Sequence, residues 1–580
     1  MTTFAADLYL LVAAFGLALP VSYAGLPVLG QGAFVAVGAF GTLLLAGHGT
    51  PLLVAVIVAV AIATVAGYLV GYAATRLAGA ALALGTWGIA WLAYVVLVQF
   101  PRVSGGSQGL THTAPARLVS PSLGLTVTLH PWVHALVAGI VCAALALVLR
   151  HAASGPWGLD WAALRTGPAL ADSLGVPVQR RRRALLAASG ALAALGGAGT
   201  AILIGVAAPA DYSPLLSLQL FVAVLIGGVA TWWGPVVGVA LLAALPSTSD
   251  NLASAMGADP LRVRAVLTAA LLVVALVLRR PAADVVRRLT ARLPASWIEW
   301  LAAPRRATVE TERAAARPTA LASRAPVLTL TDVAVHYAGV TALDGVDVDV
   351  RAGEVHALVG PNGSGKSTVL RVATGVVAPA AGVVTLYGDA PAPRAGAAAP
   401  RVAAGVVRTL QRTALLGPLP AEVQTAVGAR VRERVGFAGL RHLFATPQAR
   451  RLARDRQRLA AAALASVDLG HATGVPADRL DSADQRLLQV ARAVATGAPA
   501  LLLDEPAAGM SARDRQRLAR ALRTLADDGY GVLFVEHDMA LVGTVADRVT
   551  VLDAGRVIAS GTFAQIQQDA AVRAAYLGQS

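Results

Sequence analysis

This 580-residue chain has few charged side chains and a single cysteine. Charged residues make up 14% of the sequence, with none from Leu8 to Thr75, whereas hydrophobic residues reach 56%. The mean hydropathy of +0.63 is typical of membrane proteins. Cys142 lies in an apolar run, which excludes a disulfide or zinc framework within the chain. Residues 1–30 have no basic region before their apolar stretch, so we interpret them as a retained membrane segment and not a cleaved signal peptide.

Lysine is almost absent too. Of the 48 basic residues only Lys366 is a lysine, and it lies in the run GPNGSGKST, Gly360–Thr368. Arginine's planar fork suits bidentate partners, whereas a phosphate-binding loop needs a compact ammonium on a slim stem. The run fits the phosphate-loop pattern, follows the apolar strand VHALVG and precedes a helical stretch. It therefore predicts nucleotide binding.

The net charge of +15 does not by itself indicate nucleic acid. Arginine is dense near residues 150–183, 279–325 and 430–460, and positive charge beside membrane spans follows from the positive-inside rule. No basic patch is interleaved with aromatic residues, so we expect no nucleic-acid partner.

Apolar stretches long enough to cross about 30 Å of hydrocarbon recur through the first half of the chain. They lie near residues 7–24, 30–46, 52–75, 80–99, 131–149, 184–206, 217–245 and 262–278. The run 217–245 is broken by GGVATWWGP, which predicts two short half-helices inside the protein, because lipid-exposed irregular backbone is forbidden. We expect an all-α polytopic membrane domain of about eight to ten helices. The arginines of 150–183 and Arg279–Arg280 place those segments in the cytoplasm and residues 100–130 outside.

The composition changes twice along the chain and predicts three parts. Residues 1–280 form the transmembrane domain, and residues 281–325, rich in Ala, Arg and Pro, form a cytoplasmic linker. From Pro326 short β-branched runs alternate with helical stretches, which predicts an α/β domain over 326–580 with a largely parallel core sheet. Within it ALLLDEP, Ala500–Pro506, is an apolar strand ending in Asp504, placed for magnesium, and Glu505, placed to polarise water.

Residues 326–580 resemble the ATP-binding domain of an ABC transporter, of the branched-chain amino acid importer type. The resemblance rests on the phosphate loop and ALLLDEP, and on further residues in the family's order: Tyr337 where the family stacks an aromatic on adenine, Gln411 in VVRTLQR, Gly509 after LDEPAA, His537 in VEHDM, the arginine-rich insert 430–460 and the ending AYLG. The fold implied is an α/β P-loop ATPase domain of the ABC type.

The resemblance assigns roles to these positions. The catalytic residues would be Glu505, His537 and Gln411, and Mg²⁺ would be held by Ser367, Asp504 and Gln411. The residues expected to bind ATP are Tyr337, Gly360, Asn362, Gly363, Ser364, Gly365, Lys366, Ser367 and Thr368.

One motif departs from the family. The signature, approximately LSGGQ or LSYGQQR, is LDSADQR here, with Asp481, Ser482, Ala483 and Asp484 at its centre. In ABC dimers this segment closes over the γ-phosphate held by the other subunit, and carboxylates there would repel it. An alternative role for Asp481 or Asp484 is that of helix N-cap. We infer an asymmetric dimer in which this chain supplies the competent ATP site and needs a partner with an intact signature.

Residues 1–280 resemble the permease subunits of the same importer family. The matching runs are Ser22–Phe40, Ser104–Leu110, Ala163–Arg182 and Gly227–Gly238. The third run implies a coupling loop that inserts into a groove on the ATPase. Its expected residues are Arg165, Ala171, Leu174 and Gly175. The first run departs from the family, which usually carries a histidine near Gln31.

The spans contain no deeply placed ionisable residue, which argues against a proton- or cation-coupled carrier and suits a neutral or zwitterionic solute. Gln31, Ser22 and Tyr23 are candidate pathway residues, although small polar side chains equally serve helix packing. His130 and His134 have a spacing that a metal site uses, but no third ligand is in view, and interfacial placement is favoured.

The leading hypothesis is a fused permease–ATPase subunit of an ABC importer for branched-chain or related hydrophobic amino acids, in the inner (plasma) membrane. The family implies ATP and Mg²⁺, a second permease, a second ATPase and an extracytoplasmic solute-binding protein. Two alternatives stay open. One is the same importer class acting on urea or short amides, and the other is a nucleotide-gated facilitator with a degenerate ATP site.

Overall fold

The computed structural model describes residues 1–577, apart from 75–76, 78, 112–116, 121–124, 129, 229–230, most of 260–324, 338, 389, 418 and 434–445. The predicted span 262–278 therefore lies largely outside the described residues. So do Arg279–Arg280, nearly all of the linker 281–325, part of the insert 430–460 and the last residue of the AYLG ending, Gly578. The chain forms two compact units. The first comprises Met1–Ser154 and Gln179–Arg305, and the second comprises Gly155–Val178 and Arg306–Ser580.

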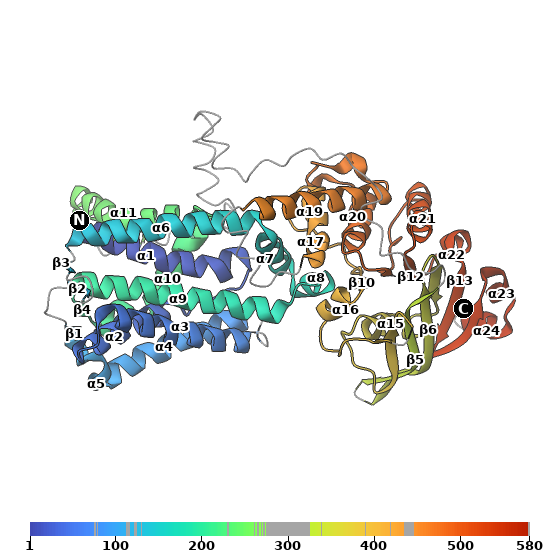
Figure 1. Cartoon of the computed structure of the whole chain (residues 1–580), viewed down its shortest axis with the longest axis horizontal. Coiled ribbons are helices and arrows are strands. Elements are labelled where there is room, and N and C mark those ends of the chain that lie inside the picture. Colours follow the sequence, from blue (N-terminus) through green and yellow to red (C-terminus); the bar gives the residue numbers. More distant parts are fainter. Residues whose placement is uncertain are drawn as a thin grey trace. The chain divides into compact units, whose positions relative to one another are not determined.

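The first unit is built from apolar helices, eight of them in the described residues (Figure 1). Six are long enough to span a membrane. They are α1 (Thr2–Ala18, continued by the π-helical turn Leu19–Tyr23), α3 (Leu52–Ala74), α4 (Ala80–Gln99), α6 (Pro131–Ser154), α9 (Val178–Ile204) and α11 (Gly234–Met256). Two are shorter, α2 (Gln31–Gly47) and α10 (Pro214–Gly227). The predicted polytopic helical domain is confirmed.

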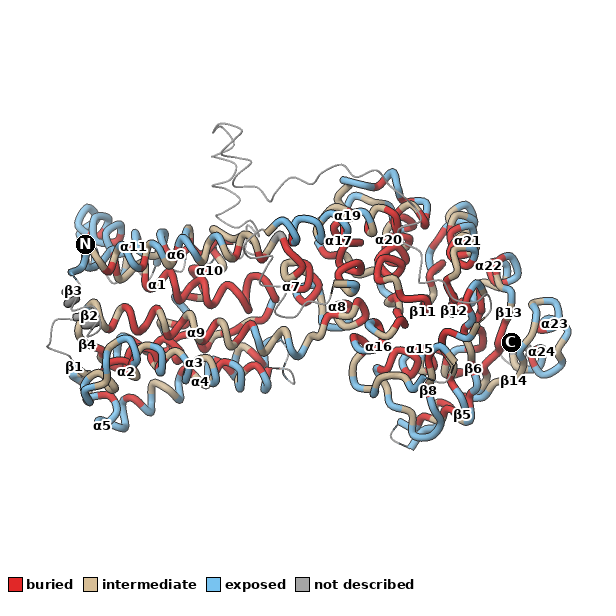
Figure 2. The backbone as a smooth tube through the Cα atoms, viewed as in Figure 1, coloured by how far each residue is buried: buried red, intermediate tan, exposed pale blue. Residues whose placement is uncertain are grey.

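Small residues decide which face of a helix is buried. The buried positions of α3 are all Ala or Gly, at Ala55, Ala59, Ala63, Gly67, Gly71 and Ala74. Its large side chains, including Leu53, Ile57 and Leu69, are exposed, as expected of a helix whose outer face meets lipid. Figure 2 shows that α1 is buried along most of its length.

The break in the run 217–245 is present, but the prediction of two short half-helices is wrong for the second one. Only α10 is short, and it ends at Gly227 before Gly228 turns the chain with a φ of 113°. Helix α11 has 23 residues because it continues through Pro246 and a polar stretch to Met256. Glycine lets the two helices touch, since a Cβ on Gly238 would lie 1.8 Å from the carbonyl oxygen of Ala223.

Short elements of regular structure lie in the described loops between the helices. A short helix α5 (Pro101–Ser104) precedes β1 (Leu110–Thr111), which pairs antiparallel with β4 (Val206–Ala207). Strands β2 (Arg117–Ser120) and β3 (Leu125–Thr128) form an antiparallel hairpin.

The second unit is an α/β domain around a six-stranded sheet of order β10-β11-β12-β7-β13-β14. These strands are β7 (Val355–Val359), β10 (Val406–Arg408), β11 (Ala500–Asp504), β12 (Gly531–Val535), β13 (Arg548–Asp553) and β14 (Arg556–Gly561). All neighbours pair in parallel except β13 and β14. The predicted ABC-type P-loop fold is confirmed.

A second sheet is antiparallel, with the order β6-β5-β8-β9. It contains β5 (Pro326–Tyr337), β6 (Val340–Arg351), β8 (Ala381–Leu386) and β9 (Ala390–Pro391). The helices of the unit are α7 (Pro156–Thr166), α8 (Pro168–Ser173), α15 (Lys366–Ala373), α16 (Ala399–Ala403), α17 (Ala421–Ala429), α19 (Pro447–Ser466), α20 (Ser482–Ala495), α21 (Ala512–Asp527), α22 (Met539–Val545), α23 (Phe563–Gln568) and α24 (Ala570–Leu577).

The core sheet separates two hydrophobic cores. Along β7, Val355, Ala357 and Val359 belong to one core and Leu358 to the other, because successive strand residues point to opposite faces. All five residues of β7 are buried, so the phosphate loop leaves a rigid strand.

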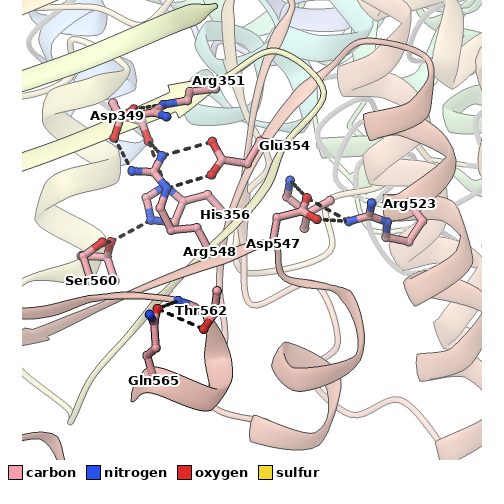
Figure 3. A network of polar contacts seen from close by, with 12 residues as sticks. Asp349, Arg351, Glu354, His356, Arg523, Asp547, Arg548, Ser560, Thr562 and Gln565 are labelled. Atoms are coloured by element: carbon pink, nitrogen blue, oxygen red, sulfur yellow. Dashed lines mark hydrogen bonds and ion pairs between the residues drawn. The ribbon is translucent and has the colours of Figure 1, made fainter. Parts of the chain in front are cut away.

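A polar network joins the core sheet to the antiparallel sheet (Figure 3). The Arg548 guanidinium donates to Glu354 at 2.8 and 3.1 Å and also pairs with Asp349. His356 lies beneath it and is hydrogen-bonded to the Asp349 carbonyl and the Thr550 hydroxyl, both at 2.8 Å. These contacts join β6, β7 and β13 into one body.

Candidate ATP-hydrolysis site

Four of the predicted motifs lie at one edge of the core sheet. The phosphate loop follows β7, Gln411 follows β10, Glu505 follows β11 and His537 follows β12. The four strands are neighbours and run parallel. Their carboxyl ends therefore meet, which is where parallel α/β sheets bind ligands.

The phosphate loop is closed around its lysine. Lys366 is the first residue of α15, and its Nζ donates to the carbonyl oxygens of Gly360 and Pro361, both at 2.8 Å. Glycine is required at Gly360, because a Cβ there would lie 2.0 Å from the carbonyl oxygen of Leu552. Burial lowers the pKa of Lys366, and the charges of Glu505 and Asp504 act in the opposite direction. A loop of backbone N–H groups at a helix N-terminus with one ammonium suits phosphate.

The other predicted ATP-binding residues lie in the phosphate loop, at the start of α15 and at the end of β5. Asn362 and Gly363 are exposed on the loop and Ser367 is exposed in the first turn of α15, whereas Ser364 of the loop is buried. The exposed Ser367 hydroxyl is one residue from Lys366, which fits the predicted magnesium ligand. Tyr337 ends β5 with 40% of its surface exposed, which leaves its ring free to stack on a base.

The structure brings the three predicted catalytic residues together. The Glu505 carboxylate accepts a hydrogen bond from Gln411 Nε2 at 3.0 Å through one oxygen, and its other oxygen lies 3.3 Å from Nε2 of His537. Glu505 has a φ of +47°, a region that non-glycine residues rarely adopt. Strain of this kind concentrates at functional sites, and here it sits on the residue between the two partners.

Asp504 has a partner that the sequence reasoning did not single out. Arg408, the last residue of β10, places Nη2 2.5 Å from Asp504 Oδ2. The Asp504 side chain is only 4% exposed, and its backbone N–H donates to the Thr409 hydroxyl at 3.2 Å. Arg408 occurs in VVRTLQR, three residues before Gln411, and that proximity is the only signal the sequence contains.

Glu536 is a second residue of the site that the sequence did not indicate. This buried carboxylate accepts hydrogen bonds from the backbone N–H of Ala507 at 2.6 Å and of His537 at 3.2 Å. Burial raises its pKa, and the two backbone hydrogen bonds oppose the rise. Glu536 thus fixes the backbone on both sides of the Glu505–His537 pair.

One face of α20 holds the loop that contains Gln411. Three side chains spaced three residues apart donate to its carbonyl oxygens, which makes a ladder of hydrogen bonds. They are Arg486 to Gln411 at 2.5 Å, Gln489 to Arg412 at 3.0 Å and Arg492 to Ala414 at 2.7 Å. Complete burial lowers the pKa of Arg492 to about 10.

The altered signature segment begins the same helix. Asp481 is the N-cap of α20, and its carboxylate accepts from the Asp484 N–H at 2.7 Å, as the helix-cap alternative predicts. Asp484 is buried and pairs with Arg517 at 3.0 Å and with His471 at 3.5 Å. Ser482 is exposed and Ala483 is buried. Of the two carboxylates expected to repel the γ-phosphate, Asp484 is therefore buried and paired, and only Asp481 is exposed.

The predicted coupling residues belong to the same compact unit as the ATPase. Ala171 and Leu174 are buried, and a Cβ on Gly175 would lie 2.9 Å from Cγ2 of Val431. Arg165 is exposed at the end of α7. The sequence reasoning missed Asp172, whose carboxylate accepts from the N–H groups of Ala398 and Ala399 at 2.7 and 3.1 Å.

The candidate pathway residues in the first unit are all buried. Gln31 Nε2 donates to the carbonyl oxygens of Ala13 and Ser189 at 3.1 and 3.3 Å, and the Ser189 hydroxyl donates to its amide oxygen at 3.0 Å. Gln31 therefore joins α1, α2 and α9. Ser22 and Tyr23 lie in the π-helical turn after α1.

The two histidines of the pair differ in their surroundings. His134 is buried and hydrogen-bonds to the Tyr9 hydroxyl at 2.9 Å, whereas His130 is exposed. Among the described residues no group of three or more His, Cys, Asp or Glu could hold a metal ion.

Three family models match the chain. The one described as "Branched-chain amino acid transport system / permease component" covers residues 2–276, "ABC transporter" covers 343–508, and "Branched-chain amino acid ATP-binding cassette transporter" covers 556–580.

The chain is similar to several characterised ATP-binding proteins. The high-affinity branched-chain amino acid transport ATP-binding protein BraF of Pseudomonas aeruginosa is 34% identical over 256 residues, which cover 44% of this chain and 99% of that protein. LivG of Escherichia coli, with the same description, is 32% identical over 257 residues, covering 44% and 99%. The hemin import ATP-binding protein HmuV of Streptomyces coelicolor is 36% identical over 232 residues, covering 40% and 76%.

These matches confirm the resemblance over both halves of the chain. The apolar helices and the permease match make this a multi-pass membrane protein with a cytoplasmic ATPase domain. The chain belongs to the ABC transporter family of the branched-chain amino acid type, with permease and ATPase joined in one polypeptide, and couples ATP hydrolysis to transport.

Proposed function

We propose that this chain is a fused permease–ATPase subunit of an importer for branched-chain or related hydrophobic amino acids in the inner (plasma) membrane. The observation that carries the proposal is the position of Glu505. Its two oxygens are held by Gln411 and His537, beside Asp504 and a phosphate loop with a buried lysine. We further propose the domain limits 1–280, 281–325 and 326–580 for permease, linker and ATPase.

Each residue has a defined task in hydrolysis. Lys366 exchanges its loop carbonyl partners for the β- and γ-phosphate oxygens of ATP. Glu505 orients the attacking water and accepts its proton, because the contacts with Gln411 and His537 fix both carboxylate oxygens. His537 also stabilises the γ-phosphate, and Tyr337 stacks on adenine.

Mg²⁺ fits the donor set here. Ser367, Asp504 and Gln411 supply hydroxyl, carboxylate and amide oxygens, the hard ligands that Mg²⁺ prefers. When bound, Mg²⁺ neutralises phosphate charge. Asp504 is already fixed for this role by Arg408 and Thr409.

The second composite site of the dimer is proposed to be weak. Asp481 caps α20 with its own carboxylate, so a negative charge already occupies the helix N-terminus that would otherwise receive the partner's γ-phosphate. The active site is then formed by this chain's phosphate loop, Glu505 and His537 with the intact signature of a second ATPase. A second permease and an extracytoplasmic solute-binding protein complete the complex.

Reconstituted uptake tests the proposal. The full chain and its partner subunits are placed in liposomes with ATP inside, and labelled leucine, isoleucine, valine and urea are supplied with the binding protein. We expect ATP-dependent uptake of the amino acids and its loss in Glu505→Gln, with ATP binding retained. Uptake of urea alone would favour the amide alternative. Uptake unaffected by Glu505→Gln, without vanadate-sensitive ATPase, would favour the nucleotide-gated facilitator.

A further inference from the structure

The segment Gly155–Val178 follows α6 and leads into α9, yet it belongs to the compact ATPase unit. Helix α7 packs against α17, and α8 packs against α16 (Figure 1). A small cavity of about 10 Å³ between α8 and α20 is lined by Leu170, Ser173, Leu174 and Arg492 among others. Its volume is about that needed to hold one water molecule.

One arginine of the ATPase contacts this segment at two points. Arg430, which follows α17, places Nε 2.6 Å from Oδ1 of Asp160 on α7. Its Nη2 donates to the carbonyl oxygen of Gly175, beyond α8, at 3.0 Å. The guanidinium thus links the start and the end of the segment. Both side chains of the ion pair are buried, Arg430 with 5% and Asp160 with 0% exposed.

A second ion pair lies beside the first. Arg456 of α19 pairs with Glu433 at 2.6 Å, and both side chains are largely buried. Burial raises the pKa of Glu433, whereas the charges of Arg456 and Arg430 oppose that rise. The two pairs form a buried charge cluster that joins the permease segment to the arginine-rich insert.

A buried charge stabilises a complex only when its partner is present, since an unpaired buried ion carries a large desolvation penalty. Such a pair therefore discriminates strongly against a wrong occupant. A loop without a carboxylate at the position of Asp160 would leave the buried cluster with two arginines, Arg430 and Arg456, and a single carboxylate, Glu433. Shape adds to this, because Gly175 has a φ of +75°, and a Cβ there would lie 2.9 Å from Cγ2 of Val431 and 3.1 Å from Cγ1 of Val402.

We propose that Arg430 is a specificity-determining residue that, through Asp160 and Gly175, selects this chain's own permease loop over the corresponding loop of a second permease. The ATPase of this chain then drives its own permease in cis. The proposal rests on the proposed function and adds to it the route by which the competent ATP site acts. Arg430 is a positioning residue, since it touches no substrate.

A charge-exchange series on the full chain tests the pairing. The variants are Arg430→Asp, Asp160→Arg and the double exchange, assembled with the partner subunits in liposomes. Three quantities are measured: ATP binding, solute taken up per ATP hydrolysed, and amide hydrogen exchange at Ala398 and Ala399. These two amides report docking directly, because they donate to Asp172 of the segment.

Each single exchange is expected to lower uptake per ATP at least about tenfold and to accelerate exchange of the two amides about tenfold, while ATP binding changes less than about twofold. The double exchange restores both quantities to within about threefold of the parent. Rescue by the double exchange identifies cis pairing. If Arg430 paired with the loop of a second permease, the change at Asp160 would not alter that loop and could not restore the ion pair.

The proposal is overturned if the single exchanges leave amide exchange and uptake per ATP unchanged, or if the folded double exchange is no better than the singles. Should charge reversal prevent folding, Asp160→Asn keeps the shape of the side chain and is expected to produce the same uncoupling. Asp455→Asn on α19, where the aspartate is 61% exposed, is the matched control and should behave as the parent. Failure of the proposed function can be told apart from failure of this proposal. In that case the unmodified complex would show no ATP-dependent uptake, while hydrogen exchange at Ala398 and Ala399 would still report docking of the segment.

Discussion

Arg408 Nη2 lies 2.5 Å from the Oδ2 atom of Asp504, and both side chains are largely withdrawn from solvent. Loss of one member of a buried ion pair typically costs about 3–5 kcal/mol, because the remaining charge is uncompensated. Arg408→Gln should therefore lower the free energy of unfolding of the ATPase unit by about 3 kcal/mol. Calorimetry of the purified complex measures this.

Arg412→Gln is the matched control, since Arg412 is exposed four residues further along the chain. It should unfold like the parent. The double change Arg408→Gln with Asp504→Asn removes both charges and should recover part of the loss. An Arg408→Gln protein as stable as the parent would show that the pair contributes nothing.

Lys366 and Asp481 should respond in opposite ways. Lys366→Ala removes the only ammonium in the loop, so ATP affinity should fall by about a hundredfold or more and uptake should disappear. Asp481→Ser restores the family's hydroxyl cap at the second site and should leave uptake within about twofold. Nucleotide binding and uptake are measured on the same preparations.

Comparison with the partner's site completes this test. The phosphate-loop lysine of the second ATPase is replaced by alanine in the same complex. The ATP site of that lysine is the one that the LDSADQR segment of this chain closes. The asymmetric arrangement predicts a much smaller loss of uptake from that change. Equal losses from both lysine replacements would refute the asymmetry.

The local motifs could be predicted from the sequence because their chemistry is carried by short contiguous runs. The phosphate loop and the strand ending in Asp504 and Glu505 need only a strand and a turn. Arg408 could not be assigned in this way, because its contact with Asp504 arises from the pairing of β10 with β11, which are almost a hundred residues apart in the chain.

The same reason explains the other corrections. From the sequence alone, Asp484 is expected to face the partner's γ-phosphate beside Asp481. In the structure it pairs with Arg517 of α21. The prediction of a short half-helix ending near residue 245 was wrong. The hydropathy of the sequence falls after Pro246, but helix α11 continues to Met256. Tertiary packing, and not local composition, decides these positions.

His356 should make the ATPase unit sensitive to acid. Burial first, and the nearby Arg548 charge second, lower its pKa from 6.5 to about 4. Between these values the unfolded chain binds a proton that the folded chain does not, so stability falls as the pH falls from about 6.5 toward 4. The loss is about 3 kcal/mol at most. Thermal unfolding between pH 7.5 and 4.5 tests this.

His356→Gln removes the titrating group and should flatten this pH dependence while lowering stability at neutral pH. His336→Gln, at an exposed histidine on β5, is the control and should retain the parental profile. An unchanged acid dependence in His356→Gln would assign the effect to other groups.

Gly38 should be intolerant of any larger side chain. A Cβ there would lie 2.0 Å from the carbonyl oxygen of Ala194, so the backbones of α2 and α9 are in direct contact. The approach is reciprocal, since a Cβ on Gly197 of α9 would lie 2.0 Å from the carbonyl oxygen of Val35. Membrane helices have no hydrophobic drive toward one another, and their association depends on this close packing.

Gly38→Val should therefore separate the helices and reduce the monodisperse fraction in detergent several-fold. Gly47→Val, at the end of the same helix where a Cβ meets nothing within 4 Å, should leave that fraction unchanged. A Gly38→Val protein with parental yield and uptake would mean that the α2–α9 contact does not hold the permease together.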